Sequence, residues 1–334
     1  MKSNLLNPAE ELLIPYSDTV SAITEALGNA KNVLIGTHEH PDGDALGSSL
    51  AIMHALESKG ITCTAYIPDA APNYFAYLPG YERLTTVKPN IDAFDTVILL
   101  DYTQLPRTHL EAEVLAHGRV ISIDHHYDNT KKATINLVVT EAAATAHILF
   151  PLILALDIAI TQDIATCLLT GIFTDTGSFM HDSVTPEILQ ISSYLMKKGA
   201  RLSHIAHETY QKKDLPSLRI WGKALSRISI SPTTGASVSV ITKEDLEECG
   251  ATLDDLSGIV SMLNTLPDTK FAMMLVEYGD GKVKGSLRSE PHKGVDVSKI
   301  AKRLGGGGHK LASGFEVAGH LVQVDGKWRV TRVG

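Results

Sequence analysis

Residues 33–48 have the sequence VLIGTHEHPDGDALGS, which indicates how the first half of the chain folds. VLIGT is a short apolar run of the kind that forms a buried strand, and Pro41 and Gly43 permit a tight turn after it. From Asp44 to Lys59 apolar residues recur every three or four positions, which predicts a helix that ends at Gly60. The stretch therefore predicts a strand, a loop and a helix in immediate succession.

The same alternation continues on both sides of this stretch. Ser17 is expected to cap a preceding helix, and two further apolar runs, TVILLD (96–101) and RVISID (119–124), each end at an aspartate. Alternating strands and helices are typical of an α/β domain with a mainly parallel sheet flanked by helices. The apolar stretch 146–160 is shorter than the ~20 residues that cross a bilayer, so we expect it in the core and predict no membrane association.

A chain of 334 residues exceeds the size at which single hydrophobic cores usually stop growing, which favours two domains. Thr185, Pro186 and Gly199 mark the start and end of a helix, and the first domain is predicted to comprise residues 1–199. Residues 200–222 are polar with a helical pattern and are predicted to be a connector. Two hairpin patterns follow, so residues 223–334 are predicted to form a smaller α/β domain with a mixed sheet.

The cysteines and the first residues of the chain indicate in which cellular compartment the protein is expected. The three cysteines have no CxxC spacing, which argues against a disulfide framework and a cysteine-ligated zinc site. The first thirteen residues, MKSNLLNPAEELL, lack the basic start and apolar run of a signal peptide. The sequence therefore predicts a cytoplasmic protein.

Charge is distributed unevenly along the chain. The net charge is −8, yet residues 282–310 contain eight basic and two acidic residues. A short basic segment in an acidic chain favours a small anionic substrate over duplex nucleic acid.

Acidic and imidazole side chains follow the ends of the predicted strands. His38, Asp42 and Asp44 lie on the loop after the first, and taken alone they are equally well explained as a turn and a helix cap. Further groups occupy corresponding places: Asp101, the triplet Asp124, His125 and His126, and Asp175 in GIFTDTGSF (171–179). Because the carboxyl ends of parallel strands meet at one edge, these groups should converge, and their mutual repulsion requires cations. We therefore predict a two-metal site, and oxygen and imidazole donors without thiolate suit Mn²⁺ or Mg²⁺.

These segments resemble a known family. HEHPDGDALGS, LLDYT, IDHH and GIFTDTGSF are similar to the four motifs of the DHH phosphoesterase superfamily. GSLRS (285–289) and GGGGHKLASGF (305–315) are similar to its DHH-associated substrate-binding domain. The resemblance extends from about Asn32 to Phe315. Within the superfamily, a chain of this size resembles the bacterial nanoRNases, the bifunctional oligoribonuclease and pAp phosphatase group.

The resemblance implies a role for each matching residue. His38, Asp42 and Asp101 would hold one Mn²⁺, while Asp44, Asp101, His125 and Asp175 would hold the other, with Mg²⁺ and Co²⁺ as alternative ions. His126 and Asp101 would be the catalytic residues, with His126 facing the reacting phosphate and Asp124 orienting an imidazole. In the second domain the implied substrate contacts are Arg288, Gly306, Gly307, Gly308, His309 and Ser313. Glycines let a backbone approach an anion closely, and arginine offers a forked donor to phosphate.

The implied activity is cleavage of short oligoribonucleotides to mononucleotides and removal of the 3′-phosphate from pAp. Expected partners are short single-stranded RNA or DNA, pAp and dinucleotides, and the resemblance also allows a homodimer. The alternative enzyme is a phosphodiesterase for linear or cyclic dinucleotides such as pApA or cyclic di-AMP. A noncatalytic nucleotide sensor is the alternative from another class, although the complete set of metal ligands argues against it.

Overall fold

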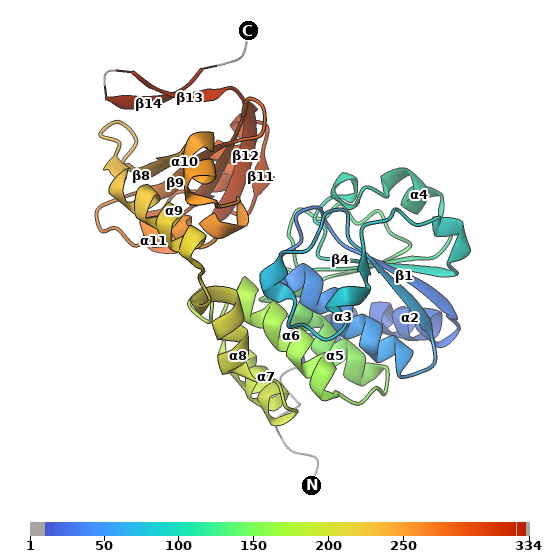
Figure 1. The fold of residues 1–334 in the computed structure, drawn as a ribbon. Coiled ribbons are helices and arrows are strands. Elements are labelled where there is room, and N and C mark those ends of the chain that lie inside the picture. Colours follow the sequence, from blue (N-terminus) through green and yellow to red (C-terminus); the bar gives the residue numbers. More distant parts are fainter. Residues whose placement is uncertain (1–10, 325, 332–334) are drawn as a thin grey trace. The chain divides into compact units, whose positions relative to one another are not determined.

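Residues 1–211 and 212–334 form two separate units in this computed structural model, which describes residues 11–324 and 326–331. Figure 1 shows the course of the chain through both units. The division falls inside the segment 200–222. The short helix α8 (Leu202–Ala206) and the π-helical turn His207–Gln211 belong to the first unit, and α9 (Leu215–Ser226) belongs to the second.

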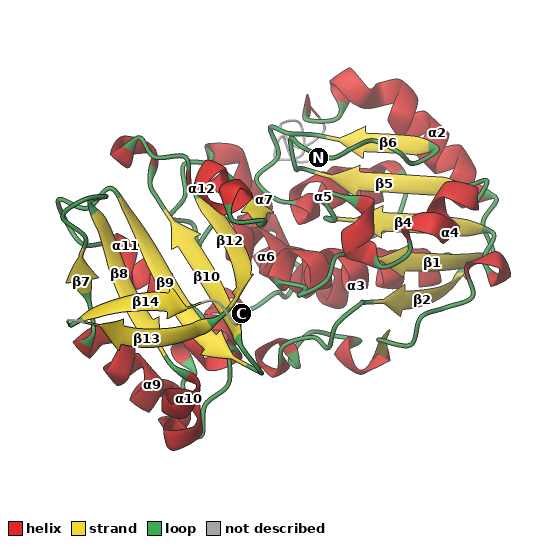
Figure 2. Cartoon of the chain, turned by 90° about the horizontal axis from the view of Figure 1, so that it is seen from above, coloured by secondary structure: helices red, strands yellow, loops and turns green. Residues whose placement is uncertain are grey.

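A sheet of six parallel strands organises the first unit, as the sequence predicted. The order of its strands is β3-β2-β1-β4-β5-β6, and Figure 2 shows most of them side by side. Their bounds are β1 (Asn32–Gly36), β2 (Thr62–Tyr66), β3 (Leu84–Thr85), β4 (Thr96–Leu100), β5 (Val120–Asp124) and β6 (Ile135–Val138).

Both faces of this sheet are buried, which explains why its strands are continuous apolar runs. In β1, Val33 and Ile35 face one core and Leu34 faces the other, because successive side chains of a strand point to opposite faces. The larger core contains residues of five long helices, and the smaller one contains α4 (Glu111–Ala116). The five helices are α2 (Ser17–Gly28), α3 (Gly43–Glu57), α5 (Thr145–Ala155), α6 (Gln162–Asp175) and α7 (Pro186–Lys197).

The ends of several helices follow the local chemistry of the sequence. Asp42 caps α3 by accepting from the amides of Asp44 and Ala45, and Thr185 caps α7 as predicted. The expectation for Ser17 was wrong. A 3₁₀ turn (Ile14–Tyr16) runs directly into α2, so Ser17 lies inside the helix and Tyr16 occupies the cap position without a side-chain bond.

The second unit is built on a mixed sheet, as predicted. Its strand order is β11-β12-β10-β9-β8-β7, in which β8 and β9 are parallel and the other pairs are antiparallel. One core lies against α9, α10 and α11 and another against α12. The bounds are β7 (Ser229–Ile230), β8 (Ala236–Ile241), α10 (Lys243–Cys249), α11 (Ile259–Asn264), β9 (Phe271–Tyr278), β10 (Lys282–Arg288), α12 (Val297–Arg303), β11 (Gly307–Gly308) and β12 (Ala312–Ala318).

A separate two-stranded ribbon, β13 (His320–Val324) and β14 (Lys327–Thr331), completes this unit. The stretch 146–160 forms most of α5 and is largely buried in the first unit, as expected. Among residues 11–324 and 326–331, no helix combines the length and the apolar character needed to cross a membrane.

Candidate active site

The acidic cluster lies at the point where the strand order of the first sheet reverses. The chain leaves β1 toward β2 on one side and leaves β4 toward β5 on the other. In open α/β sheets, ligands bind at such a switch point, beyond the carboxyl ends of the strands. His38, Asp42 and Asp44 follow β1, and Asp101 follows the adjacent β4. The predicted convergence of these segments is therefore a consequence of the topology.

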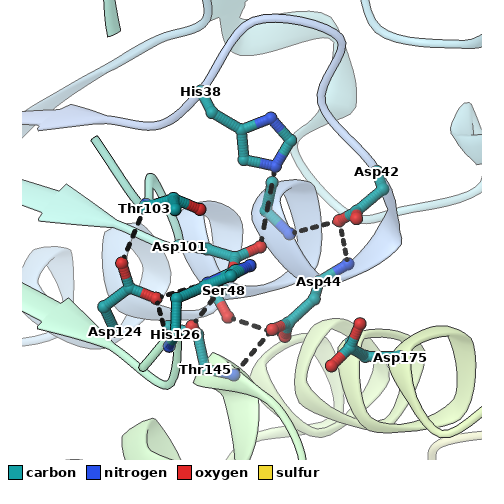
Figure 3. A network of polar contacts seen from close by, with 12 residues as sticks. His38, Asp42, Asp44, Ser48, Asp101, Thr103, Asp124, His126, Thr145 and Asp175 are labelled. Atoms are coloured by element: carbon teal, nitrogen blue, oxygen red, sulfur yellow. Dashed lines mark hydrogen bonds and ion pairs between the residues drawn. The ribbon is translucent and has the colours of Figure 1, made fainter. Parts of the chain in front are cut away.

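Six predicted metal ligands form two groups in which potential ligand atoms lie within 4.8 Å of one another. One group contains His38, Asp42 and Asp101, and the other contains Asp44, His125 and Asp175. Asp101 also approaches the second group, because its Oδ1 lies 3.5 Å from His125 Nε2. His125 Nε2 lies 3.4 Å from Asp175 Oδ2, and His38 Nε2 lies 3.7 Å from Asp101 Oδ2. Figure 3 shows most of this cluster, with Asp101 central in it.

Two glycines bring Asp44 and Asp175 together by allowing α3 and α6 to pack closely. A Cβ on Gly171 would lie 2.6 Å from Asp44 Oδ1, and a Cβ on Gly47 would lie 2.5 Å from the carbonyl oxygen of Cys167. Real side chains do not tolerate such contacts, so the helices could not approach this closely with larger residues. Asp44 begins α3, and Asp175 ends α6. The expectation that Asp175 follows the end of a strand was therefore wrong, and the close packing of the two helices is what places both carboxylates in one cluster.

The turn after β4 holds Asp101 in an unusual backbone conformation. Asp101 has φ +53° and Thr103 has φ +59°, and the left-handed region is unfavourable for a β-branched residue such as threonine. Tyr102 between them is completely buried, and the Thr103 amide donates to Asp124 Oδ2 at 2.9 Å. Such strain persists where the surroundings enforce it and is common at functional sites. Here it directs the Asp101 carboxylate into the cluster.

Asp124 connects this turn to His126. Asp124 is fully buried and accepts hydrogen bonds from the amide of Thr103, the amide and Nδ1 of His126, and Nδ2 of Asn129. The Nδ1 of His126 lies 2.7 Å from Asp124 Oδ1, which fixes the orientation of the ring. These bonds match the expectation that Asp124 orients an imidazole.

Burial and charge repulsion act strongly on two of the carboxylates. Burial, with the nearby charges of Asp101 and Asp175, raises the pKa of Asp44 well above its usual range. Burial likewise raises the pKa of Asp175 to about 6, against the attraction of His125 and with the repulsion of Asp42 and Asp101. Asp101 differs: although burial opposes its ionisation, His125 and His38 hold the pKa of its carboxyl well below the usual range.

The two imidazoles of the cluster present the same ring atom to it. His38 Nδ1 lies 2.6 Å from the carbonyl oxygen of Glu39, and His125 Nδ1 lies 3.3 Å from that of Ala142. In each ring Nε2 faces the carboxylates, whose negative charge raises the pKa of both imidazoles although burial opposes it. A neutral ring with its hydrogen on Nδ1 would instead present the Nε2 lone pair to a divalent ion, which is the arrangement typical of metal-ligating histidines. The residues present therefore fit divalent ions held by oxygen and imidazole donors.

The predicted substrate residues of the second unit lie around β10 and the glycine turn. Arg288 ends β10, and its Nη1 donates to the carbonyl of Leu287. Gly306 supports the end of α12, since its amide donates to the Ala301 carbonyl. The Ser313 hydroxyl donates to the carbonyl of His309 at 2.6 Å, so it fixes the conformation of the turn.

The glycines of this turn differ in their surroundings. A Cβ on Gly306 would lie 2.0 Å from the Gly314 carbonyl oxygen, and Gly308 has φ +122° with a Cβ position 2.7 Å from the Ala312 oxygen. A Cβ on Gly307, in contrast, would meet no atom within 4 Å. The close approach to β12 thus requires Gly306 and Gly308, while Gly307 borders open space.

Comparison with known protein families identifies both units of the chain. Residues 32–172 match the model of the DHH family N-terminal domain, and residues 235–324 match that of the DHHA1 domain. A bifunctional oligoribonuclease and PAP phosphatase NrnA from Thermus thermophilus is 32% identical over 305 residues, which cover 91% of this chain and 90% of that protein. The chain belongs to the DHH family.

A second curated relative and a solved structure are also similar to this chain. A cyclic-di-AMP phosphodiesterase GdpP from Geobacillus thermodenitrificans is 26% identical over 324 residues, which cover 91% of this chain and 47% of that protein. The crystal structure of an exopolyphosphatase-related protein from Bacteroides fragilis has a TM-score of 0.84 and 28% identity, covering 91% of this chain and 92% of that one. The predicted fold class, with a DHH domain followed by a smaller mixed-sheet domain, is thereby confirmed.

Within the DHH domain the structure adds four residues that the motifs did not predict. The Ser48 hydroxyl donates to Asp44 Oδ1, and Thr145 bonds to both Asp44 and Asp101. Asn129 holds Asp124, and Arg107 Nη2 lies 3.2 Å from His38 Nδ1. The spacing of Ser48, four residues after Asp44 on a predicted helix, could have indicated its contact. Asn129 lies only five residues after Asp124 but in no regular pattern with it, and the contacts of Thr145 and Arg107 depend on tertiary packing, which local patterns do not reveal.

Proposed function

We propose that this DHH-family protein is a divalent-metal-dependent phosphohydrolase that cleaves short oligoribonucleotides to mononucleotides and dephosphorylates pAp to AMP. The observation that carries the proposal is the buried cluster of carboxylates and inward-facing imidazole nitrogens at the switch point of the sheet. The relative from Thermus thermophilus, which covers nearly the whole chain, carries both of these activities in its name. Both reactions break a phosphorus–oxygen bond, so one cluster can serve them.

In this proposal His38, Asp42 and Asp101 hold one ion, and Asp44, Asp101, His125 and Asp175 hold the other. Divalent ions there would supply positive charge that acidifies a water molecule and offsets the negative charge building on the attacked phosphate. The mixture of oxygen and nitrogen donors favours Mn²⁺, with Mg²⁺ and Co²⁺ as alternatives. Asp101 belongs to both groups, and its strained turn fixes the carboxylate before any ion binds.

His126 is assigned to the reacting phosphate. Asp124 fixes the ring through Nδ1, so the position of the other nitrogen, Nε2, is also fixed. A hydrogen bond from Nε2–H to a phosphate oxygen, or to the departing oxygen, would stabilise charge that develops as the bond breaks. The buried contacts of Asp124 prevent the ring from rotating away.

The second domain is assigned to the rest of the substrate. Arg288 offers a forked pair of donors to a phosphate, and His309 can contact a phosphate or a base. Gly306 and Gly308 permit the tight turn that presents His309, Gly307 leaves room for a ligand, and Ser313 maintains the turn through the His309 carbonyl. The length of this basic segment suits substrates of a few nucleotides.

A dinucleotide phosphodiesterase is the second candidate function. It is favoured by the similarity to the cyclic-di-AMP phosphodiesterase of Geobacillus thermodenitrificans, although the chain spans about half the length of that relative. The same cluster and the same reaction would serve it, and the difference would lie in the second domain. Substrate preference therefore separates the two proposals.

The test is turnover with Mn²⁺ on a panel of pAp, RNA of two to about twenty nucleotides, pApA, cyclic di-AMP and pyrophosphate. The proposal expects pAp and RNA of two to five nucleotides to be the best substrates by kcat/KM, with activity lost in EDTA. Preference for cyclic di-AMP would support the second candidate. Binding without turnover of any substrate would support a sensor and overturn both. Asp101→Ala, checked for folding by circular dichroism, should abolish turnover.

A further inference from the structure

Thr145, the first residue of α5, contacts two of the clustered carboxylates at once. Its backbone amide donates to Asp44 Oδ2 at 2.6 Å, and its hydroxyl donates to Asp101 Oδ1 at 3.2 Å. The residue is completely buried. Figure 3 shows both bonds and the position of Thr145 beside the two aspartates. Thr145 therefore links a carboxylate of the first ligand group to one of the second.

The amino end of α5 supplies a further donor to Asp44. The residue at the cap position of α5 is Ala144, whose methyl group cannot accept from the first amides of the helix. Asp44 accepts from them instead: the amide of Ala146 donates to its Oδ1 at 3.0 Å, and Ser48 Oγ donates to the same oxygen at 3.2 Å. These backbone and hydroxyl donors hold the Asp44 carboxyl group at the amino end of α5. Asp44 thus caps a helix that lies about one hundred residues further along the chain.

We propose that Thr145 is a positioning residue that fixes the separation and orientation of Asp44 and Asp101 for divalent ions. The inference rests on the proposed function, because it requires an ion to bind at the cluster. Both carboxyl groups must be ionised when they hold ions, and two like charges in a buried site repel each other. The two donors of Thr145 hold them in place before an ion binds, so the ion does not have to order them.

The hydroxyl bond can be separated from the other functions of the residue. The amide bond to Asp44 belongs to the backbone and persists whatever the side chain. Valine has nearly the same shape as threonine, so Thr145→Val retains the packing and removes only the bond to Asp101 Oδ1. Thr145→Ser keeps the hydroxyl and removes the methyl group. A matched control is Thr209→Val, since Thr209 is also buried in this unit and its hydroxyl donates to the Ile205 carbonyl, outside the cluster.

The experiment is a calorimetric titration of Mn²⁺ into EDTA-stripped protein, followed by measurement of kcat and KM for pAp at saturating Mn²⁺. Removing a partner that orients a metal ligand typically weakens metal binding about 10- to 100-fold. We expect a loss in this range for Thr145→Val, binding within about threefold of wild type for Thr145→Ser, and wild-type binding for Thr209→Val. The KM for pAp at saturating Mn²⁺ should change little, because Thr145 contacts the carboxylates and not the substrate.

The outcomes separate this inference from the proposed function. Wild-type protein that binds none of Mn²⁺, Mg²⁺ and Co²⁺ in this titration would overturn the proposed function itself. If the wild type binds Mn²⁺ and a folded Thr145→Val variant binds it equally tightly, only the positioning role is refuted. Should the valine variant fail to fold, Thr145→Ser and Thr145→Ala replace it, because both lack the methyl group and differ only in the hydroxyl. Equal Mn²⁺ affinity of that pair would also refute the role.

Discussion

Replacing Asp175 by asparagine should stabilise the ion-free protein, although it removes a group that we assign to ion binding. Asp175 is partly buried among negative charges, and its pKa rises from 3.8 to about 6 on folding. The folded state then binds more protons than the unfolded state between these pH values, so stability falls as pH rises through that interval. Above this interval, the ionised carboxylate lowers the free energy of unfolding by at most about 3 kcal/mol. Because the side chain is 28% exposed, solvent reduces this penalty, and we expect a gain of about 1 to 3 kcal/mol at pH 7.5.

The assay is urea unfolding of both proteins in EDTA at pH 5 and pH 7.5, repeated at pH 7.5 with Mn²⁺. In EDTA, the free energy of unfolding of Asp175→Asn should exceed that of the wild type by more at pH 7.5 than at pH 5. With Mn²⁺ the wild type should become the more stable of the two proteins, because it binds the ion more tightly and is stabilised more by it. Asp157→Asn is the control, since Asp157 is exposed and has φ +55°, a conformation that asparagine adopts readily. A variant no more stable than wild type at pH 7.5 in EDTA would refute the argument from burial and charge.

Three further predictions concern other parts of the chain. Gly306→Ala should destabilise the second unit by about 1 to 3 kcal/mol, because its Cβ would collide with the backbone of β12, whereas Gly307→Ala should leave the thermal midpoint unchanged. Equal midpoints for the two variants would contradict this. Asp124→Asn should lower kcat for pAp at least about tenfold, because the amide cannot accept from all four donors that Asp124 now serves, and an unchanged kcat would exclude its orienting role. Asp245→Asn should cost about 1 to 3 kcal/mol at pH 7, since Arg227 holds the pKa of that carboxyl well below its usual range despite burial. Because that pKa is lowered by folding, the contribution is present above about pH 4 and is lost at lower pH, so urea unfolding of variant and wild type should converge in acid.

The sequence was sufficient to predict the parallel sheet and the convergence of its acidic residues. Strands buried on both faces are continuous apolar runs, so TVILLD and RVISID were recognisable, and each ended at an aspartate that the fold places at the same edge. The helix caps at Asp42 and Thr185 also depend only on neighbouring residues, because each side chain accepts from amides two or three positions further on. Such features depend on residues within a few positions of one another, which is the range over which a sequence pattern is informative.

The remaining features depend on packing between distant segments. Nothing near Thr145 indicates that its hydroxyl meets Asp101, because that contact exists only once α5 lies against the end of β4. Gly171 was recognisable as part of a motif, but its contact with Asp44 follows from the crossing of α3 and α6. Ser17 shows the same limit at a helix end, since the preceding 3₁₀ turn moved the cap position to Tyr16. The glycine turn was assigned to a ligand, whereas Gly306 and Gly308 are also required by the backbone of β12.

Whether two ions bind at the cluster can be measured by anomalous X-ray scattering at the manganese edge, on crystals grown with Mn²⁺. We expect two peaks in the first unit, one bounded by His38, Asp42 and Asp101, and the other by Asp44, Asp101, His125 and Asp175. A well-ordered cluster with no anomalous peak, or peaks confined to other parts of the chain, would contradict this expectation.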